Sequence, residues 1–121
     1  MARIYLDANY FIGTVNQRKR INLASLSSHV LFISPLSVHV LYYVYKIKVP
    51  DENISKLINF FNIVSLTENL LKTSVLGPTS DLEDNIQLHS ASAADCDVFL
   101  TEDKILLKMK FFGKSAITDK V

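Results

Sequence analysis

Short apolar runs alternate along the chain with longer segments that carry apolar residues at helical spacing. The apolar runs end at polar or turn residues, which is typical of buried strands. The predicted strands cover residues 3–6, 30–33, 63–66, 98–100 and 116–117. The predicted helices cover residues 8–15, 36–47, 54–61, 67–75, 81–94 and 105–109. This alternation predicts an α/β fold with a central, mostly parallel sheet and helices on both faces.

Two of the predicted helices have recognisable starts. Pro35 follows a polar residue and suits the first turn of a helix, where its missing N–H costs nothing. Ser80 is followed three residues later by Glu83, a capping-box pattern that predicts a helix from Asp81 to about Ala94. No internal repeat or interdomain linker is visible, so residues 1–121 are predicted to form a single domain.

Composition narrows the function classes. With 121 residues, 49% hydrophobic and 21% charged, the chain can bury a core and is not disordered. Only three glycines are present, and no glycine-rich phosphate loop of the Rossmann or P-loop type occurs. The lone Cys96 excludes an internal disulfide and a thiolate zinc site, and we expect it to be a small buried residue.

The start of the chain and its apolar stretches favour an intracellular location. Met1 leads directly into the first predicted strand, without the apolar segment of a secretory signal. The most apolar stretch, residues 30–45, is interrupted by polar residues and is too short to span a membrane. We therefore expect a cytoplasmic protein with no membrane partner.

Polar side chains follow the predicted strands at the edge where α/β sheets bind ligands. Asp7 ends the first strand, and Thr101 and Asp103 follow the strand at 98–100. Asp84 lies in the first turns of the preceding helix, on its apolar stripe, so it should point partly inward. A carboxylate in such a position is costly unless a partner neutralises it.

Several carboxylates that gather without basic partners repel one another, and a hard divalent cation relieves the repulsion. Mg²⁺ takes oxygen ligands and keeps bound waters. Such an ion can activate water and stabilise charge on a phosphoryl oxygen, which indicates hydrolysis of phosphodiester bonds. The alternative is that these aspartates are helix caps and turn residues, which are common roles.

Two other aspartate-dependent classes fit the pattern less well. An aspartyl-nucleophile phosphatase would have two acids in a D-x-D pattern after the first strand, whereas this chain has Asp7-Ala8-Asn9. A phosphoreceiver domain would need an aspartate on a central strand, and the third predicted strand ends near Ser65-Leu66.

Four segments resemble PIN domains, the nuclease fold of VapC-like toxins. Residues 5–12, YLDANYFI, resemble the opening of the family. Residues 34–37, SPLS, resemble the segment that enters its second helix. Residues 81–91, DLEDNIQLHSA, resemble the D-x-E-D-x-x-Q helix of a PIN subgroup, and residues 97–104, DVFLTEDK, its strand ending in T-x-D. The segments span nearly the whole chain in the family order.

The resemblance implies a PIN-like three-layer sandwich with the activity of a metal-dependent endoribonuclease. Asp7, Asp84 and Asp103 match the acids that hold Mg²⁺ or Mn²⁺ and carry catalysis. Asn9 and Thr101 match the polar residues that support them. The implied partners are RNA and an antitoxin protein, with the chain as toxin of a toxin–antitoxin pair. Small PIN-like proteins often dimerise, and the hydrophobic content is compatible with a homodimer.

The sequence departs from the family at one acid. The second family acid is a glutamate in the helix after the second strand, and aligning residues 34–37 places Val40 there. Valine cannot bind a metal, so the alternative function is a catalytically degenerate PIN-like domain that binds RNA or protein. Asp81 can reach the same side of the helix as Asp84 and compensate, or it can be a helix-start acid favoured by the dipole. Mn²⁺ tolerates a looser site than Mg²⁺.

Local basic and aromatic residues could contact RNA, because a net charge of +1 gives no strong overall attraction. Arg18, Lys19 and Arg20 form one patch, and four lysines, Lys104, Lys108, Lys110 and Lys114, form another. Three tyrosines, Tyr42, Tyr43 and Tyr45, could stack on bases. The alternative is a solvated lysine face and tyrosines that pack at the edge of the core.

Overall fold

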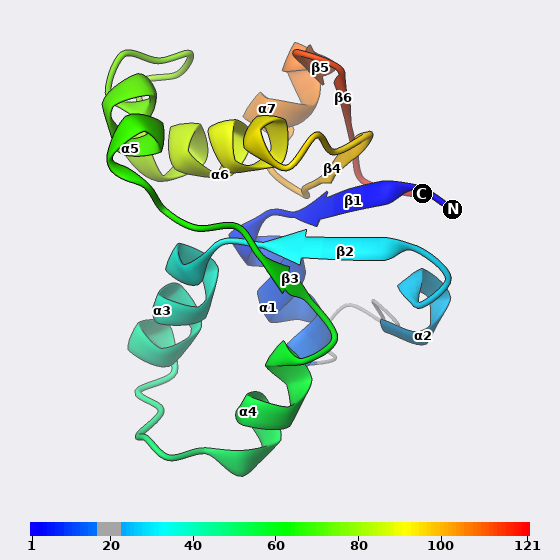
Figure 1. Cartoon of the computed structure of the whole chain (residues 1–121), viewed down its shortest axis with the longest axis vertical. Helices are drawn as coiled ribbons and strands as arrows, with labels where there is room; N and C mark the ends of the chain where they lie inside the picture. Colours follow the sequence, from blue (N-terminus) through cyan, green and yellow to red (C-terminus); the bar gives the residue numbers. More distant parts are fainter. Residues whose placement is uncertain (17–22) are drawn as a thin grey trace.

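The computed structural model describes residues 1–16 and 23–121 (Figure 1). Within these residues six strands form one sheet in the order β3-β2-β1-β4-β6-β5. The strands are β1 (Arg3–Leu6), β2 (Val30–Ile33), β3 (Asn62–Ile63), β4 (Val98–Leu100), β5 (Phe111–Phe112) and β6 (Ser115–Thr118). All neighbouring pairs are parallel except β5 and β6, which pair antiparallel. The predicted mostly parallel sheet is confirmed.

Helices cover both faces of this sheet and give a three-layer sandwich (Figure 1). They are α1 (Ala8–Asn16), α2 (Leu23–Leu26), α3 (Pro35–Val44), α4 (Glu52–Ile58), α5 (Glu68–Ser74), α6 (Leu82–Ala93) and α7 (Lys104–Met109). Helices α1, α3 and α4 lie on one face, and α5, α6 and α7 lie on the other. None of the helices in the described residues is long and apolar enough to cross a membrane.

Alternate residues of β1 supply the two halves of the core. Ile4 and Leu6 are fully buried in the cluster under α1, α3 and α4, whereas Tyr5 is fully buried in the cluster under α6 and α7. This division follows from the two-residue period of a strand. The Tyr5 ring stacks on Phe99 of β4, with ring centroids 5.5 Å apart. A strand buried on both faces is rich in apolar residues, and the buried part of β1, from Ile4 to Leu6, carries no charged side chain.

The ends of three elements, β3, α3 and α4, each come three residues earlier than predicted, and α4 ends at Ile58 instead of residue 61. Strand β3 stops at Ile63 instead of reaching residue 66, because its partner β2 ends at Ile33 and the chain then turns into α3. Helix α3 ends at Val44 instead of residue 47, because Lys46 has a φ of 52°, which breaks the helix. Helix α2 and strand β5 were not predicted, since each is too short to produce a periodic pattern.

The helix starts confirm one cap and correct another. Ser34 is the N-cap of α3, where its side chain accepts from the Leu36 N–H, and Pro35 occupies the first turn as predicted. The predicted capping box of Ser80 is wrong. Asp81 is the N-cap of α6, since its Oδ1 accepts from the backbone N–H of Asp84 at 3.0 Å. Asp caps a helix as well as Ser does. Asp81 also stands one residue closer than Ser80 to the apolar stripe of α6.

Cys96 lies in the core cluster beneath α6 and α7 and is fully buried. Burial raises the pKa of its thiol to about 12, so the thiol stays protonated at neutral pH. The predicted role as a small buried residue is confirmed.

Truncating Leu41 should destabilise the protein strongly, because this α3 side chain is fully buried. We expect Leu41→Ala to lower the free energy of unfolding by about 2–5 kcal/mol. Val44 on the same helix is 56% exposed, so Val44→Ala should change it by no more than about 0.5 kcal/mol. Urea unfolding of both variants measures the difference, and equal effects would contradict the described packing of α3.

Candidate functional site

Three polar residues meet where the central parallel strands end. Asp7 follows β1, Ser34 follows β2 and Thr101 follows β4, and β1 lies between the other two strands. The Thr101 hydroxyl donates to Asp7 Oδ2 at 2.7 Å, across 94 residues of sequence. The sequence placed Asp7 and Thr101 at this edge of the sheet, and the two residues are in direct contact there.

Asp7 is the most deeply buried acid of the described chain, with 4% of its surface exposed. Its Oδ1 accepts from the Ala8 backbone N–H at 2.9 Å, and its Oδ2 accepts from Thr101. Burial nevertheless raises its pKa to about 6, because the two hydrogen bonds do not compensate for lost hydration. The negative charges of Glu83 and Asp103 raise that pKa further.

Asp84 stands in the first turn of α6 and is half-buried. Burial is the main cause that raises its pKa to about 7, followed by the charges of Asp81, Asp7 and Asp103. Charges that alter one another's pKa in this way lie in the same region of the protein. The effect of Asp7 and Asp103 on Asp84 therefore indicates that acids from the end of β1, the first turn of α6 and the start of α7 lie in one region of the protein.

Asp103 also has a local structural role. It is the N-cap of α7, and its Oδ1 accepts from the backbone N–H groups of Ile105 at 2.8 Å and Leu106 at 3.2 Å. The Thr101 hydroxyl accepts from the Asp103 N–H at 3.0 Å while it donates to Asp7. Thr101 thus links the first and last acids of the site through one oxygen atom.

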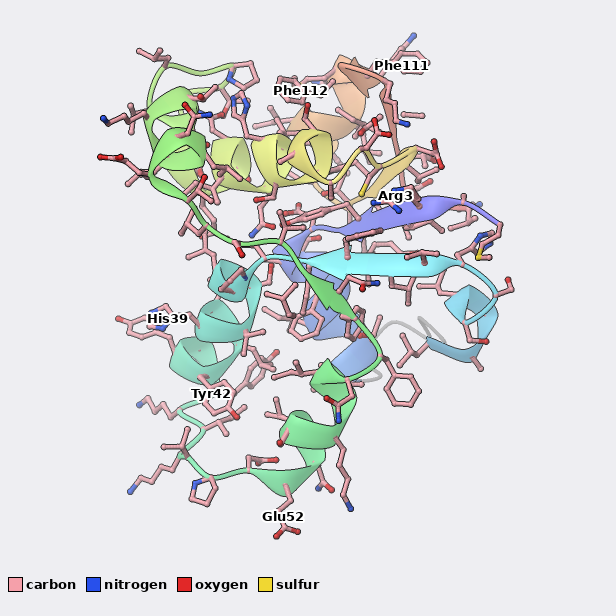
Figure 2. The ribbon with its side chains drawn as sticks, in the orientation of Figure 1. Arg3, His39, Tyr42, Glu52, Phe111 and Phe112 are labelled. Atoms are coloured by element: carbon pink, nitrogen blue, oxygen red, sulfur yellow. The ribbon has the colours of Figure 1, made fainter. Side chains whose placement is uncertain are left out.

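The other residues that the sequence analysis singled out lie on α1, at the start of α6 and on α3. Asn9 is exposed in the first turn of α1. Asp81 caps α6, so one of its carboxylate oxygens is engaged by the helix. Val40 is half-buried on α3, where the resemblance expects a glutamate. Its neighbour His39 is exposed, points away from the sheet and stacks on Tyr43 (Figure 2).

The acids fit a divalent cation in charge and ligand chemistry but do not form a complete cage. In residues 1–16 and 23–121, no three or more His, Cys, Asp or Glu side chains are arranged to hold a metal ion. No ion pair within these ranges neutralises Asp7, Asp84 or Asp103. Mg²⁺ commonly binds through one or two carboxylates, with waters and substrate phosphates as its other ligands. Asp7 and Asp84 can provide that smaller set.

The sequence analysis assigned no role to one buried polar side chain near these acids, the glutamine that closes the D-x-E-D-x-x-Q motif. Gln87 of α6 is fully buried, and its Oε1 accepts from the Tyr5 hydroxyl. Its Nε2 donates to Ser37 Oγ of α3 at 3.1 Å. Its position was the available signal, because Gln87 lies on the same inward stripe as Asp84 and Leu88.

Asn85 is a second residue that the sequence did not reveal. Its side chain accepts from the Thr79 N–H at 2.9 Å and donates to the carbonyls of Thr79 and Ser74, each at 2.9 Å. These bonds fix the turn between α5 and α6, which leads directly to the Asp81 cap. A buried Asn beside a turn is the signal that could have identified it.

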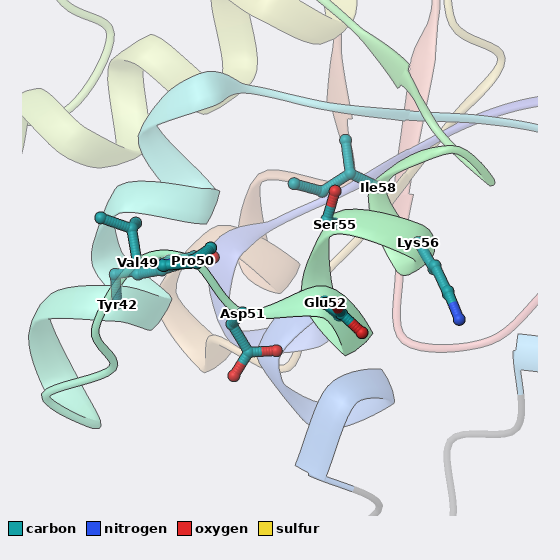
Figure 3. Close-up of a pocket in the computed structure, with 8 residues that line it drawn as sticks. All are labelled: Tyr42, Val49, Pro50, Asp51, Glu52, Ser55, Lys56 and Ile58. Atoms are coloured by element: carbon teal, nitrogen blue, oxygen red, sulfur yellow. The ribbon is translucent and has the colours of Figure 1, made fainter.

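One hollow of the described surface lies away from the acids. A cavity of about 420 Å³ opens between α3 and α4 (Figure 3). Its lining residues are Tyr42, Val49, Pro50, Asp51, Glu52, Ser55, Lys56 and Ile58. Asp51 caps α4 by accepting from the Ile54 N–H at 3.1 Å, so this acid is structural. None of the predicted site residues lines the cavity.

Lys114, from the predicted C-terminal basic patch, lies away from the acids. Lys114 forms ion pairs with Asp95 at 3.0 Å and with Asp97 at 3.5 Å. Asp97 precedes β4, so Lys114 is at the amino end of this strand, opposite to Thr101. The patch at residues 18–20 lies outside the described residues.

One solved structure has a similar fold along nearly the whole chain. It is VapBC2 from Rickettsia felis bound to a DNA fragment from their promoter. The TM-score is 0.65 at 20% sequence identity, and the match covers 96% of this chain and 97% of the other. The fold is PIN-like. The sequence itself matches no protein-family model and no curated protein.

The raised pKa of Asp7 predicts that the protein loses stability as the pH rises from 4 to 8. Folded Asp7 keeps its proton to about pH 6, whereas an unfolded aspartate releases it near pH 3.8. The folded state binds more protons between these values, so the free energy of unfolding falls with rising pH. The loss from Asp7 is about 3 kcal/mol, and the partly exposed Asp84 adds less.

The variant Asp7→Asn separates the contribution of Asp7 to the pH dependence of stability from the contributions of other titrating groups. We expect the variant to match the wild type near pH 4 and to exceed its free energy of unfolding by about 3 kcal/mol at pH 8. Urea unfolding at low salt with a chelator present measures both proteins. A difference that stays constant with pH would contradict the assignment of the raised pKa to Asp7.

Proposed function

We propose that this chain is a metal-dependent endoribonuclease that hydrolyses RNA phosphodiester bonds as the toxin of a toxin–antitoxin pair. One observation carries the proposal. Asp7, Asp84 and Asp103 come from three separate parts of the chain, and the negative charges of Asp7 and Asp103 raise the pKa of Asp84 near the carboxyl ends of the strands. In an open parallel sheet this edge is where ligands bind. The PIN-like fold supports the same conclusion.

Each side chain has a separate role in the proposed site. The Thr101 hydroxyl and the Ala8 N–H hold both oxygens of Asp7, which fixes the carboxylate in one orientation. Asp7 and Asp84 would hold Mg²⁺ or Mn²⁺, with Asp103 adding negative charge beside them. Bound there, the ion would activate a water molecule and neutralise charge on the phosphoryl oxygen. Asn9 is exposed beside Asp7 and would orient the RNA backbone or a water.

The proposed partners are an antitoxin protein and a second copy of the chain, in the cytoplasm. The solved structure with the similar fold is a complex, VapBC2, bound to promoter DNA. Apolar side chains are exposed on and after α5, including Leu71, Val75 and Leu76. Exposed apolar side chains in one region favour contact with another protein.

A second candidate function is a catalytically degenerate PIN-like domain that binds RNA or protein. Val40 favours it, because α3 places an apolar side chain where the resemblance expects an acid. The lack of a three-ligand cage in the described residues is compatible with both candidates.

RNA cleavage tests the first candidate. The wild type should cleave single-stranded RNA with Mg²⁺ or Mn²⁺, and Asp7→Asn should reduce the rate by about 100-fold or more. Asp95→Asn is the matched control, since Asp95 is an exposed acid that pairs with Lys114 away from the site. Equal cleavage by wild type and Asp7→Asn would reject the proposed mechanism.

Restoring the missing acid separates the two candidates. In a degenerate site Val40→Glu should produce a large gain in Mn²⁺ affinity and in cleavage, because it adds a carboxylate beside Asp7 and Asp84. Val44→Glu adds the same charge one turn farther along α3 and should produce no gain. Efficient cleavage by the wild type, with no gain from Val40→Glu, would exclude degeneration.

A further inference from the structure

The protein buries polar side chains in a layer beneath the proposed site. Asp7, Ser34 and Thr101 follow three neighbouring strands, and Ser37, Gln87 and Ser90 come from the helices beside them. Each of the six is at most 4% exposed. Buried polar groups cost free energy unless they are hydrogen-bonded, and apolar residues would fill the same space at less cost. A concentration of such groups at one edge of the sheet therefore points to a role beyond packing.

Gln87 connects all three layers of the sandwich within this region. It belongs to α6 on one face of the sheet, and Ser37 belongs to α3 on the opposite face (Figure 1). The two helices meet around the end of β2, where the Gln87 amide donates to the Ser37 hydroxyl. The Tyr5 hydroxyl of β1 donates to the same Gln87 side chain. One amide thus fixes two helices and the central strand relative to one another.

The two ends of this connection lie next to the proposed metal ligands. Gln87 is three residues after Asp84, so both side chains are on the same face of α6. Tyr5 is two residues before Asp7, and residues two apart on a strand point to the same side of the sheet. The bond between Tyr5 and Gln87 therefore ties the turn that carries Asp84 to the strand that carries Asp7. Ser37 stands in the same relation to Val40, three residues farther along α3.

We propose that Gln87 is a positioning residue that sets the separation of Asp84 and Asp7 and holds α3 against them. The inference rests on the proposed function, since it assigns Gln87 a task in the same site. It gives a role to a fully buried glutamine on the inward face of α6. Position 40 carries valine and no acid. The polar contact from α3 to Gln87 is made instead by the neutral Ser37 hydroxyl.

Mn²⁺ affinity of the folded protein, measured by calorimetry, tests this role. Gln87→Met keeps the length and apolar stem of the side chain but removes its hydrogen bonds to Tyr5 and Ser37. We expect this variant to bind Mn²⁺ about 10-fold more weakly, or weaker still. Ser115→Ala is the matched control. Ser115 is buried and donates to the Cys96 carbonyl at 2.7 Å, at the opposite end of the strands. The Ser115→Ala variant should be less stable than the wild type but should bind Mn²⁺ with the same affinity.

A double-mutant cycle identifies the bond through which Gln87 acts. Tyr5→Phe removes the hydroxyl and leaves the ring stacked on Phe99. Combined with Gln87→Met, it should weaken Mn²⁺ binding no further than Gln87→Met alone, because both changes remove the same bond. Ser37→Ala removes a smaller group and should weaken binding in the same direction. It tests the role even if Gln87→Met does not fold.

The outcomes separate this inference from the proposed function. If Asp7→Asn abolishes Mn²⁺ binding while Gln87→Met and Ser37→Ala bind like the wild type, the positioning role is wrong and the metal site stands. If wild type and Asp7→Asn do not differ, the proposed metal site is wrong.

Amide hydrogen exchange then decides the positioning role without a metal. Asp84 and Asn85 donate their backbone N–H groups to Asp81 at the start of α6. Gln87→Met should speed exchange at these two amides relative to Ser115→Ala. Equal rates in both variants would overturn the inference.

Discussion

The buried negative charge of Asp7 is the constraint on which the rest of the site depends. Asp7 follows the central strand, and its carboxylate is enclosed by β1, the start of α1 and the end of β4. Two hydrogen bonds hold it, yet its pKa stays well above the ordinary value. A fold selected only for stability would place a neutral residue there. The buried polar side chains near Asp7, among them Thr101 and Gln87, provide the polar environment that this charge requires.

Stability and proposed activity oppose each other in this arrangement. Bringing Asp84 and Asp103 toward Asp7 adds repulsion to a carboxylate that burial already destabilises. In the proposed metal site the same repulsion would favour binding of a cation, so the interaction that weakens the fold would be the one that holds the ion. Thr101 moderates the conflict by fixing Asp7 and the Asp103 backbone with a single hydroxyl.

The sequence predicted most of the elements in their order and placed Asp7 and Thr101 at the ends of strands, because both follow from local patterns. Apolar periodicity identified the strands, and parallel strands bring their carboxyl ends together. The lengths of the elements were harder to predict. Strand β3 is short because β2 ends early, which is a property of the partner strand. The bond between Tyr5 and Gln87 joins residues 82 positions apart, and no local pattern encodes such a pairing. Ser80 and Asp81 are adjacent and have similar capping strength, so the sequence did not decide which of them caps α6.

The outer strands of the sheet have a consequence for how copies of the chain can associate. Strand β3 at one edge and strand β5 at the other each contain two residues. An edge this short offers few free backbone groups to an incoming strand, which limits aggregation by sheet extension. Growth of the sheet from one molecule to the next is thereby discouraged at both borders. Specific assembly is left to the helical surfaces, where side-chain shape decides which surfaces fit together.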